Sequence, residues 1–321
     1  MAERIGVIGA GAFGTALAVA QAAAGREVAL WLRDPAAAAE MAEGRENRAR
    51  LPGVRLPPGV VPTADIANAA REIVLLAVPT QRLREVLQAQ AERLAGCTLV
   101  ACCKGVELGT GLLPTEVIAD VLPGARVAVL TGPSFAADIA RGKPTALTLA
   151  ATAPGAEALQ EALSTRSLRL YLTGDLTGAQ MGGALKNVIA IAAGVSIGAG
   201  LGESARAALM TRGFAEMTRH AEARGADSET LHGLSGLGDL VLTCTSEKSR
   251  NYRHGLALGA GRPPEAGATV EGVATARALA AAAPADALPV TAMVAALVDG
   301  KVTLADAVEL LLSRPLKRER E

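Results

Sequence analysis

The N-terminal segment restricts the fold of this chain more than any other part of the sequence. An apolar run of β-forming residues, RIGVIG at residues 4–9, leads into Gly9-Ala10-Gly11-Ala12-Phe13-Gly14. The helix-forming stretch TALAVAQAAAG follows, and Val28–Leu32 are expected to form a second strand. A strand, a glycine turn, a helix and a strand within about thirty residues predict one unit of a parallel α/β sheet.

The turn in this unit has glycine at three positions, and each glycine meets a separate physical need. Gly9 permits the sharp turn, Gly11 lets the backbone approach a pyrophosphate without an intervening Cβ, and Gly14 lets the helix pack closely on the strand. Free N–H groups at the start of the helix bind the phosphate charge. We therefore predict a Rossmann-type dinucleotide site; the alternative is a glycine-rich turn without a ligand.

Two neighbouring residues at the end of the second strand bear on which dinucleotide is bound. An acidic side chain such as Asp34 accepts hydrogen bonds from the ribose 2'-hydroxyl of NAD, whereas an arginine such as Arg33 accommodates the 2'-phosphate of NADP. We favour NADP, with use of both dinucleotides left open. Asp34 fits equally well as a helix N-cap before Pro35.

Later apolar runs supply further strands of the predicted sheet. Residues 73–79 and 98–104 are continuous apolar runs typical of strands buried on both faces. Residues 44–62 carry glycines and prolines and are expected to form an irregular connection near the site. Because ligands lie beyond the carboxyl ends of parallel strands, Lys104 is either a functional cation or an ordinary surface lysine.

Residues 126–150 add a strand, a Gly132-Pro133-Ser134 corner, a short helix and another strand. The corner offers N–H and hydroxyl groups to a ligand, although a plain turn uses the same residues. The last expected strand covers residues 168–175, and only helical stretches follow. We predict the α/β class: a dinucleotide-binding domain over residues 1–175 with a Rossmann-type, parallel-rich sheet, then an all-helical substrate and catalytic domain over residues 176–321.

The composition limits partners and location. The 321 residues suffice for two hydrophobic cores, and 32 basic residues balance 32 acidic ones, which argues against nucleic acid or an anionic membrane as a partner. The longest uncharged run, from Val188 to Glu203, is shorter than the ~20 residues that cross a bilayer, so no membrane insertion is expected. The four cysteines form no CxxC pair and have no histidine at metal-ligand spacing, which predicts reduced thiols in a cytoplasmic protein and no metal site.

The second half contains charged residues in apolar surroundings. Lys186 and Asn187 begin the stretch VIAIAAGVSIGAG; a buried ammonium needs partners, whereas a lysine at a helix end commonly extends to water. Asp239, in the segment GLSGLGDL, needs a cation or several donors and is the expected partner of Lys186. The triplet Ser249-Arg250-Asn251 offers a hydroxyl, a guanidinium and an amide to a phosphate, or else it is a solvated loop before a helix.

Seven segments in this order give the chain a close resemblance to bacterial NAD(P)-dependent glycerol-3-phosphate dehydrogenases. They are GAGAFGTALA, LTGPSFA, GGALKNVIAIAAG, TRGFAEM, GLSGLGDLVLTCTS, SRN and TVEGV, and the similarity runs from Ile5 to about Arg314. The resemblance implies reversible reduction of dihydroxyacetone phosphate, a small phosphorylated three-carbon substrate, to sn-glycerol 3-phosphate with NADP or NAD and no metal. It also implies a role at the start of glycerophospholipid synthesis and is compatible with a homodimer.

The same resemblance implies roles for individual residues. Lys186 is the implied catalytic acid/base. The residues implied to surround the substrate are Lys104, Gly132, Ser134, Lys186, Asp239, Ser249, Arg250 and Asn251. Those implied to touch the cofactor, beside the glycines Gly9, Gly11 and Gly14, are Ala12, Phe13, Arg33, Lys104, Ala136, Arg250 and Glu271. Ala12 stands where relatives often have serine, and Thr269 stands where valine is common, so we carry over Glu271 and not Thr269.

The chemistry of ketone reduction agrees with this assignment of Lys186. Hydride delivery to carbon leaves charge on the oxygen, which needs a proton or a cation, and no histidine lies in a motif. Burial and a second cation at Lys104 are expected to lower the pKa of Lys186, while Asp239 opposes that shift and fixes the orientation of the amine. Two other functions stay open: a related β-hydroxy-acid or sugar-acid-phosphate dehydrogenase, and a non-catalytic NAD(P)H redox sensor.

Overall fold

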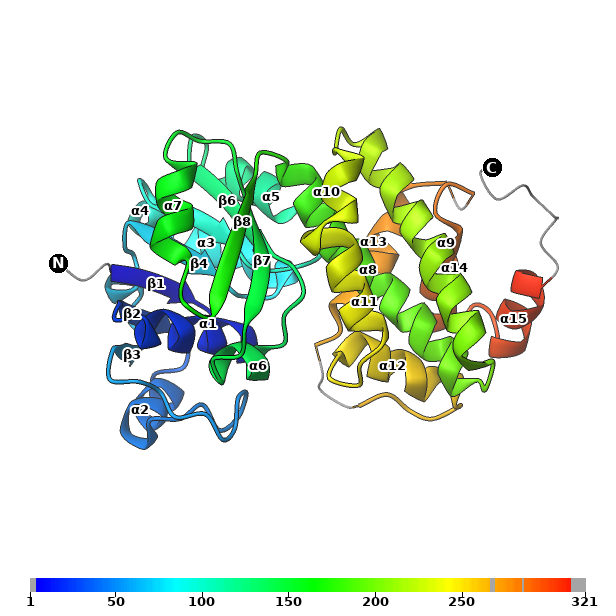
Figure 1. Ribbon diagram of the computed structural model, residues 1–321, viewed down its shortest axis with the longest axis horizontal. Helices are drawn as coiled ribbons and strands as arrows, with labels where there is room; N and C mark the ends of the chain where they lie inside the picture. Colours follow the sequence, from blue (N-terminus) through cyan, green and yellow to red (C-terminus); the bar gives the residue numbers. More distant parts are fainter. Residues whose placement is uncertain (1–3, 266–268, 285, 313–321) are drawn as a thin grey trace.

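The sheet of this protein lies within residues 4–173, called here the sheet half, and the described residues from 176 onward, called the helical half, contain helices and connections (Figure 1). The computed structural model describes residues 4–265, 269–284 and 286–312, so the end of the predicted helical domain, including Arg314, lies outside the described residues. The strands are β1 (Arg4–Ile8), β2 (Glu27–Trp31), β3 (Val60–Thr63), β4 (Ile73–Leu76), β5 (Thr98–Ala101), β6 (Arg126–Thr131), β7 (Thr145–Ala151) and β8 (Leu168–Thr173). The predicted fold class is confirmed.

The eight strands form one mostly parallel sheet in the order β3-β2-β1-β4-β5-β6-β7-β8. β7 pairs antiparallel with β6 and parallel with β8, so the last two strands run against the other six. Because the order reverses between β1 and β4, the carboxyl ends of these two strands open a crevice, which is where doubly wound sheets bind ligands.

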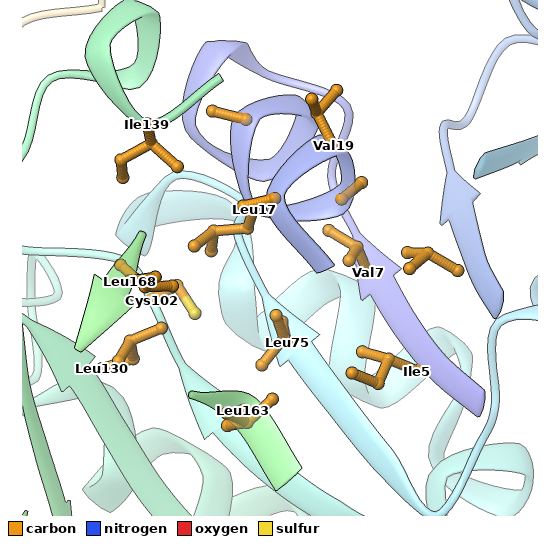
Figure 2. Close-up of a cluster of buried hydrophobic side chains, with 14 of the residues drawn as sticks. Ile5, Val7, Leu17, Val19, Leu75, Cys102, Leu130, Ile139, Leu163 and Leu168 are labelled. Atoms are coloured by element: carbon orange, nitrogen blue, oxygen red, sulfur yellow. The ribbon is translucent and has the colours of Figure 1, made fainter. Parts of the chain in front are cut away.

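Both faces of the sheet are covered, which explains its uninterrupted apolar strands. Ile5 and Val7 of β1 and Leu75 of β4 pack on one face, against Leu17 of the first helix (Figure 2). Ile8 belongs to the cluster on the opposite face, together with neighbours of Leu75 on β4. Successive residues of a strand point to opposite faces, so a sheet with two apolar layers needs apolar residues at consecutive positions.

The helices of the sheet half follow the strands closely. They are α1 (Ala12–Ala23), α2 (Pro35–Gly44), the 3₁₀ turn η1 (Ile66–Asn68), α3 (Thr80–Ala89), α4 (Ala91–Leu94), α5 (Pro114–Val121), α6 (Ala136–Ala140) and α7 (Ala156–Leu163). The prediction that residues 44–62 are wholly irregular was wrong at the end, because Val60–Thr63 form β3. β3 is an edge strand, where Pro62 can be accommodated although it has no N–H to donate.

The helical half surrounds one central helix, α8 (Leu176–Gly198), which Asp175 caps by accepting from the Gly178 N–H at 2.7 Å. The others are α9 (Gly202–Ala223), α10 (Ser228–His232), a π-helical turn η2 (Leu234–Gly238), α11 (Asp239–Cys244), α12 (Arg250–Gly259), α13 (Glu271–Ala282), α14 (Pro289–Val298) and α15 (Leu304–Leu312). With 23 residues, α8 is longer than the uncharged run in the sequence, and it has the length and composition of a membrane span. Its most apolar window is 89% buried within the protein, so α8 is a core helix.

Glycines allow α8 and α12 to approach at backbone distance. A Cβ added to Gly194 of α8 would lie 2.2 Å from the carbonyl oxygen of Tyr252, and one added to Gly255 of α12 would lie 2.1 Å from that of Ile191. Any larger residue would therefore push the helices apart. This close crossing brings the start of α12 beside Asn187 in the middle of α8.

Candidate active site

The two halves of the chain enclose a cleft of about 1350 Å³. The sheet half lines it with the segments that follow β1, β2, β4 and β5 and with the start of α6. The helical half lines it with the middle of α8, with α11 and with the first residues of α12 and α13. The cleft thus lies at the crevice that the strand order predicts.

The glycine turn at the end of β1 has the form that a dinucleotide requires. Gly9 has a φ of +110°, and a Cβ there would lie 2.8 Å from the backbone of Ala77. A Cβ on Gly14 would lie 2.0 Å from the carbonyl oxygen of Gly9, so only glycine lets α1 start this close to the strand. A Cβ on Gly11 would meet nothing within 4 Å, because that position faces the open cleft. Open space beside the first turn of α1, with Ala12 and Phe13 in the lining, fits a pyrophosphate.

At the end of β2, the two candidate specificity residues have different surroundings. Asp34 caps α2 and accepts from the N–H groups of Ala36 at 2.9 Å and Ala37 at 3.4 Å. The N-cap interpretation of Asp34 is therefore confirmed. Arg33 is exposed and lines the cleft.

A buried charge cluster, Lys104–Asp239–Lys186, forms the floor of the cleft. Lys186 is only 7% exposed; its Nζ donates to Asp239 Oδ1 at 3.0 Å and to Thr243 Oγ1 at 2.7 Å. Nζ of Lys104 donates to Asp239 Oδ2 at 2.6 Å and to the Gly132 carbonyl at 3.0 Å. The expected pairing of Lys186 with Asp239 is confirmed, and the alternatives of a lysine extending to water and of a surface Lys104 are wrong.

The environment of Lys186 lowers the pKa of its amine to about 8. Burial is the largest cause, Asp239 opposes it, and the positive charge of Lys104 adds to the lowering. Asp239 shows the opposite balance: burial acts to raise its pKa, but the two lysines outweigh burial and hold the pKa below its usual value. The shift of Lys186 has the causes expected from the sequence. A lysine with a pKa near neutrality can give and take a proton at physiological pH.

The π-helical turn η2 positions Asp239 for these contacts. A Cβ on Gly236 would lie 1.9 Å from the Leu231 carbonyl, and one on Gly182 of α8 would lie 2.6 Å from the Ser235 carbonyl. Single π turns within α-helical segments frequently occur at functional sites. Asp239 is 1% exposed and, like Gly132 and Gly14, is not part of the cleft lining. Asp239 therefore acts on the cleft through Lys104 and Lys186, and Gly132 acts through Lys104 and Ser134, which bond to its carbonyl.

Polar groups for an anion gather on both sides of the buried cluster. Ser134 lines the cleft and donates its hydroxyl to the Gly132 carbonyl at 3.0 Å, and Ala136 follows it in the lining. On the opposite side, buried Ser249 caps α12 by accepting from the Tyr252 N–H at 3.2 Å, and exposed Arg250 lines the cleft. The interpretation of this triplet as a solvated loop is wrong for Ser249.

Asn251 and Glu271 connect separate helices at the rim of the cleft. The Asn251 side chain donates to Asn187 Oδ1 at 2.8 Å and accepts from the Gly272 N–H at 3.0 Å, which leaves one amide N–H for a ligand. Glu271 begins α13 and accepts from the Thr80 hydroxyl at 3.4 Å. Burial raises the pKa of its carboxyl to about 6, against the opposing effect of Arg250.

Sequence reasoning missed two side chains of this site. Thr243 is buried against Lys186 and lies one helical turn after Asp239, so the four-residue spacing was the available signal. Asn47 is buried beside the glycine turn, but nothing in its irregular segment marked it. Among the described residues, no group of three or more His, Cys, Asp or Glu side chains could hold a metal ion.

Known proteins match both halves of the chain. Residues 4–157 match the family described as NAD-dependent glycerol-3-phosphate dehydrogenase N-terminus, and residues 175–309 match its C-terminus. The chain belongs to this family. It is 61% identical to glycerol-3-phosphate dehydrogenase [NAD(P)+] of Cereibacter sphaeroides over 98% of this chain and 100% of that protein. It is 56% identical to the enzyme of the same name from Roseobacter denitrificans, over 98% of this chain and 99% of that one.

A solved relative has the same architecture over its full length. The crystal structure of glycerol-3-phosphate dehydrogenase from Coxiella burnetii superposes with a TM-score of 0.92 at 36% identity, covering 98% of this chain and 99% of that chain. Glycerol-3-phosphate dehydrogenase of Saccharomyces cerevisiae, at 21% identity and a TM-score of 0.83, shares the fold. Family membership favours the glycerol-3-phosphate dehydrogenase interpretation over the two alternatives.

Proposed function

We propose that this protein catalyses the reversible NAD(P)H-dependent reduction of dihydroxyacetone phosphate to sn-glycerol 3-phosphate. The observation that carries the proposal is the buried amine of Lys186. It lines a cleft that has a dinucleotide turn at one end and the start of α12, with Arg250, at the other. Family membership supports the same reaction.

Lys186 acts at the carbonyl oxygen of the substrate. NAD(P)H held in this cleft would supply the hydride for the carbonyl carbon. Lys186 in its ammonium form gives a proton to the oxygen as charge develops there. Asp239 and Thr243 hold the amine by hydrogen bonds of 3.0 and 2.7 Å, so its direction is fixed before the substrate arrives. Lys104 lowers the pKa of this amine and adds positive charge beside the same oxygen. In the reverse direction the neutral amine takes the proton back.

The phosphate of the substrate binds at the start of α12. Arg250 supplies a guanidinium, Ser249 has a free hydroxyl hydrogen because its oxygen accepts the helix cap, and the helix start offers N–H groups. Asn251 contributes its remaining amide N–H, and Ser134 approaches from the sheet half. Binding energy from the phosphate orients the distant carbonyl against the nicotinamide.

The cofactor lies along the sheet half of the cleft in this proposal. The turn that holds the pyrophosphate consists of Gly9, Gly11, Ala12, Phe13 and Gly14. The other residues assigned to contact the cofactor are Arg33, Lys104, Ala136, Arg250 and Glu271. We assign residues 1–175 to the dinucleotide-binding domain and residues 176–321 to the substrate domain.

The location and the role of the enzyme are also part of the proposal. Four free, buried cysteines support a cytoplasmic location. Family membership supports a role at the start of glycerophospholipid synthesis. A homodimer stays a prediction for light scattering to measure.

The reaction is tested by following NADPH and NADH oxidation with dihydroxyacetone phosphate and with unphosphorylated dihydroxyacetone. We expect turnover with the phosphorylated ketone and a kcat/KM lower by several orders of magnitude without the phosphate. Both ketones are measured at saturating NADPH, because Arg250 is also assigned to the surroundings of the cofactor. Arg250→Ala should then reduce kcat/KM for the phosphorylated ketone by about 10- to 100-fold, the size of a charged hydrogen bond, and leave the weak activity on dihydroxyacetone nearly unchanged. Equal loss on both ketones would show that Arg250 does not bind the phosphate.

A further inference from the structure

Asn47 connects the segment between α2 and β3 to the glycine turn that follows β1. Asn47 is 4% exposed, and its Nδ2 donates to the Ala10 carbonyl at 2.9 Å and to Thr15 Oγ1 at 2.8 Å. Its Oδ1 accepts from the Arg50 N–H at 3.2 Å. Both N–H groups of this amide and its oxygen thus have partners, so the side chain is held in one orientation.

The backbone around Asn47 is held by contacts that do not involve the turn. The Asn47 carbonyl accepts from the Leu51 N–H at 2.8 Å. Two residues earlier, the Arg45 guanidinium donates to the Val60 and Leu56 carbonyls at 3.0 and 3.2 Å. Because the segment is anchored separately, Asn47 can restrain the turn instead of following its movements.

The carbonyl that Asn47 holds belongs to the peptide group between Ala10 and Gly11. This group is planar and trans, so its N–H points away from its C=O. With the Ala10 carbonyl bonded to Asn47, the Gly11 N–H is directed away from Asn47. No group in the described residues accepts a hydrogen bond from this N–H, and Gly11 lines the cleft, so the N–H is available to a ligand.

Glycine at position 11 gives the same peptide group freedom to rotate. Gly11 has a φ of −69°, and turning the peptide group by about 180° would move this φ into the positive range that glycine adopts readily. A Cβ on Gly11 would meet nothing within 4 Å, so packing at this position does not oppose the rotation. The rotated group would present its carbonyl oxygen, which carries partial negative charge, where a phosphate needs an N–H.

We propose that Asn47 is the positioning residue that keeps the Gly11 N–H directed at the pyrophosphate of the dinucleotide. Its hydrogen bond to the Ala10 carbonyl prevents the rotation that Gly11 permits. Asn47 therefore affects the binding of NADPH and NADH alike, because both contain the pyrophosphate. The inference rests on the proposed function, which assigns a dinucleotide to this turn.

The experiment measures dissociation constants for NADPH and NADH by fluorescence titration of the full-length protein without substrate. Asn47→Leu removes the donors and should weaken the binding of both dinucleotides by about 10- to 100-fold, the size of a hydrogen bond to a charged group. At saturating NADPH, kcat and KM for dihydroxyacetone phosphate should change by less than about twofold, because Lys186 and α12 lie in the helical half.

Thr15→Val is the matched control. It removes the other acceptor of the same buried amide and leaves the contact with Ala10 in place. We expect Thr15→Val to lower the melting temperature as a lost buried hydrogen bond does, and to change dinucleotide binding by less than about threefold. If Asn47→Leu does not fold, Asn47→Asp has the same size and keeps an acceptor for the Arg50 N–H, but a carboxylate cannot donate to Ala10.

Crystal structures of the ligand-free wild type and variant show the peptide orientation directly. We expect the Ala10 carbonyl to turn toward the cleft in the Asn47 variant and to keep its direction in Thr15→Val. Dinucleotide affinity close to that of the wild type in the Asn47 variant, equal weakening in Thr15→Val, or an unrotated peptide group would overturn the inference. These results leave the proposed reaction intact, whereas a wild-type protein that binds neither dinucleotide would remove the proposed function itself.

Discussion

Two lysine–aspartate pairs connect the sheet half of this molecule to its helical half, and they differ in burial. Lys104 and Asp239 meet at 2.6 Å, and their side chains are 15% and 1% exposed. Lys248 and Asp138 meet at 2.9 Å, but the lysine side chain is 53% exposed. The first pair lies beneath the cleft. The second lies at the edge of the cleft, where Lys248 directly precedes Ser249.

The difference in burial determines what each pair can do. The free-energy cost of removing a buried ion pair from water is offset by the attraction and the hydrogen bonds between its members. Removing one partner leaves an uncompensated buried charge, which costs about 3–5 kcal/mol of stability. An exposed pair is screened by water and salt and contributes about 0.2–1 kcal/mol. Hydrogen bonds from Lys143 and Lys248 lower the pKa of Asp138 as well, but this carboxylate is in contact with water and lies away from the buried amines. The buried pair can therefore support proton transfer, whereas the exposed pair mainly joins two segments.

The largest effect should follow from removing the amine that shares Asp239 with Lys104. We expect Lys186→Ala to lower kcat by about 10²- to 10⁴-fold, the usual contribution of a positioned acid or base, with NADPH binding unchanged within about twofold. Steady-state kinetics and a fluorescence titration of NADPH measure the two quantities. A kcat close to that of the wild type would exclude Lys186 as the acid.

The pH dependence of kcat gives the next effect. Reduction needs the protonated amine, so kcat for dihydroxyacetone phosphate should fall as the pH rises through about 8, and kcat for glycerol 3-phosphate oxidation should rise over the same range. Lys104→Met removes a cation that lowers the pKa of Lys186, so its profile should move to higher pH. Asp239→Asn removes the carboxylate that raises it and should move the profile to lower pH.

These two variants separate electrostatic from structural roles. Asp239→Asn should also lower the melting temperature, because two buried ammonium groups lose their carboxylate, whereas Lys104→Met should affect it less. Profiles that move together, or do not move, would show that neither partner sets the pKa of Lys186.

The sequence predicted the buried contact between Asp239 and Lys186. It predicted neither the Lys104–Asp239 pair nor the exposed pair, for a physical reason. Asp239 in an apolar, glycine-rich segment must find a cation, so its pairing with Lys186 could be deduced from burial alone. Solvated side chains such as Lys248 and Asp138 have no such requirement, and their meeting depends on how the two halves pack. The second contact of Asp239, with Lys104, was missed for a related reason. It forms only because the end of β5 lies beside the start of α11.

In the fold too, the buried elements were predicted from sequence and the edge of the sheet was not. Apolar runs such as residues 73–76 predicted the buried strands, since only a sheet covered on both faces needs them. The short edge strand β3, with Pro62 in it, was hidden in a segment rich in proline and glycine, because edge pairing leaves little trace in sequence. Asn47 was missed in the same segment, since its partners at Ala10 and Thr15 are far away in the chain.

The smallest effect should come from the exposed pair. Nζ of Lys248 lies 2.9 Å from Asp138 and 5.5 Å from the centre of the Phe135 ring, so it joins the segment after Ser134 to the segment before Ser249. Lys248→Gln should raise KM for dihydroxyacetone phosphate by up to about fivefold, with kcat nearly unchanged, and the effect should shrink at high salt.

Lys143→Gln is the matched control, because Lys143 pairs with the same aspartate at 2.8 Å but lies within the sheet half. If both variants raise KM equally, the charge on Asp138 matters and the connection between the halves does not; if Lys248→Gln lowers kcat by more than tenfold, the exposed pair supports chemistry as the buried one does.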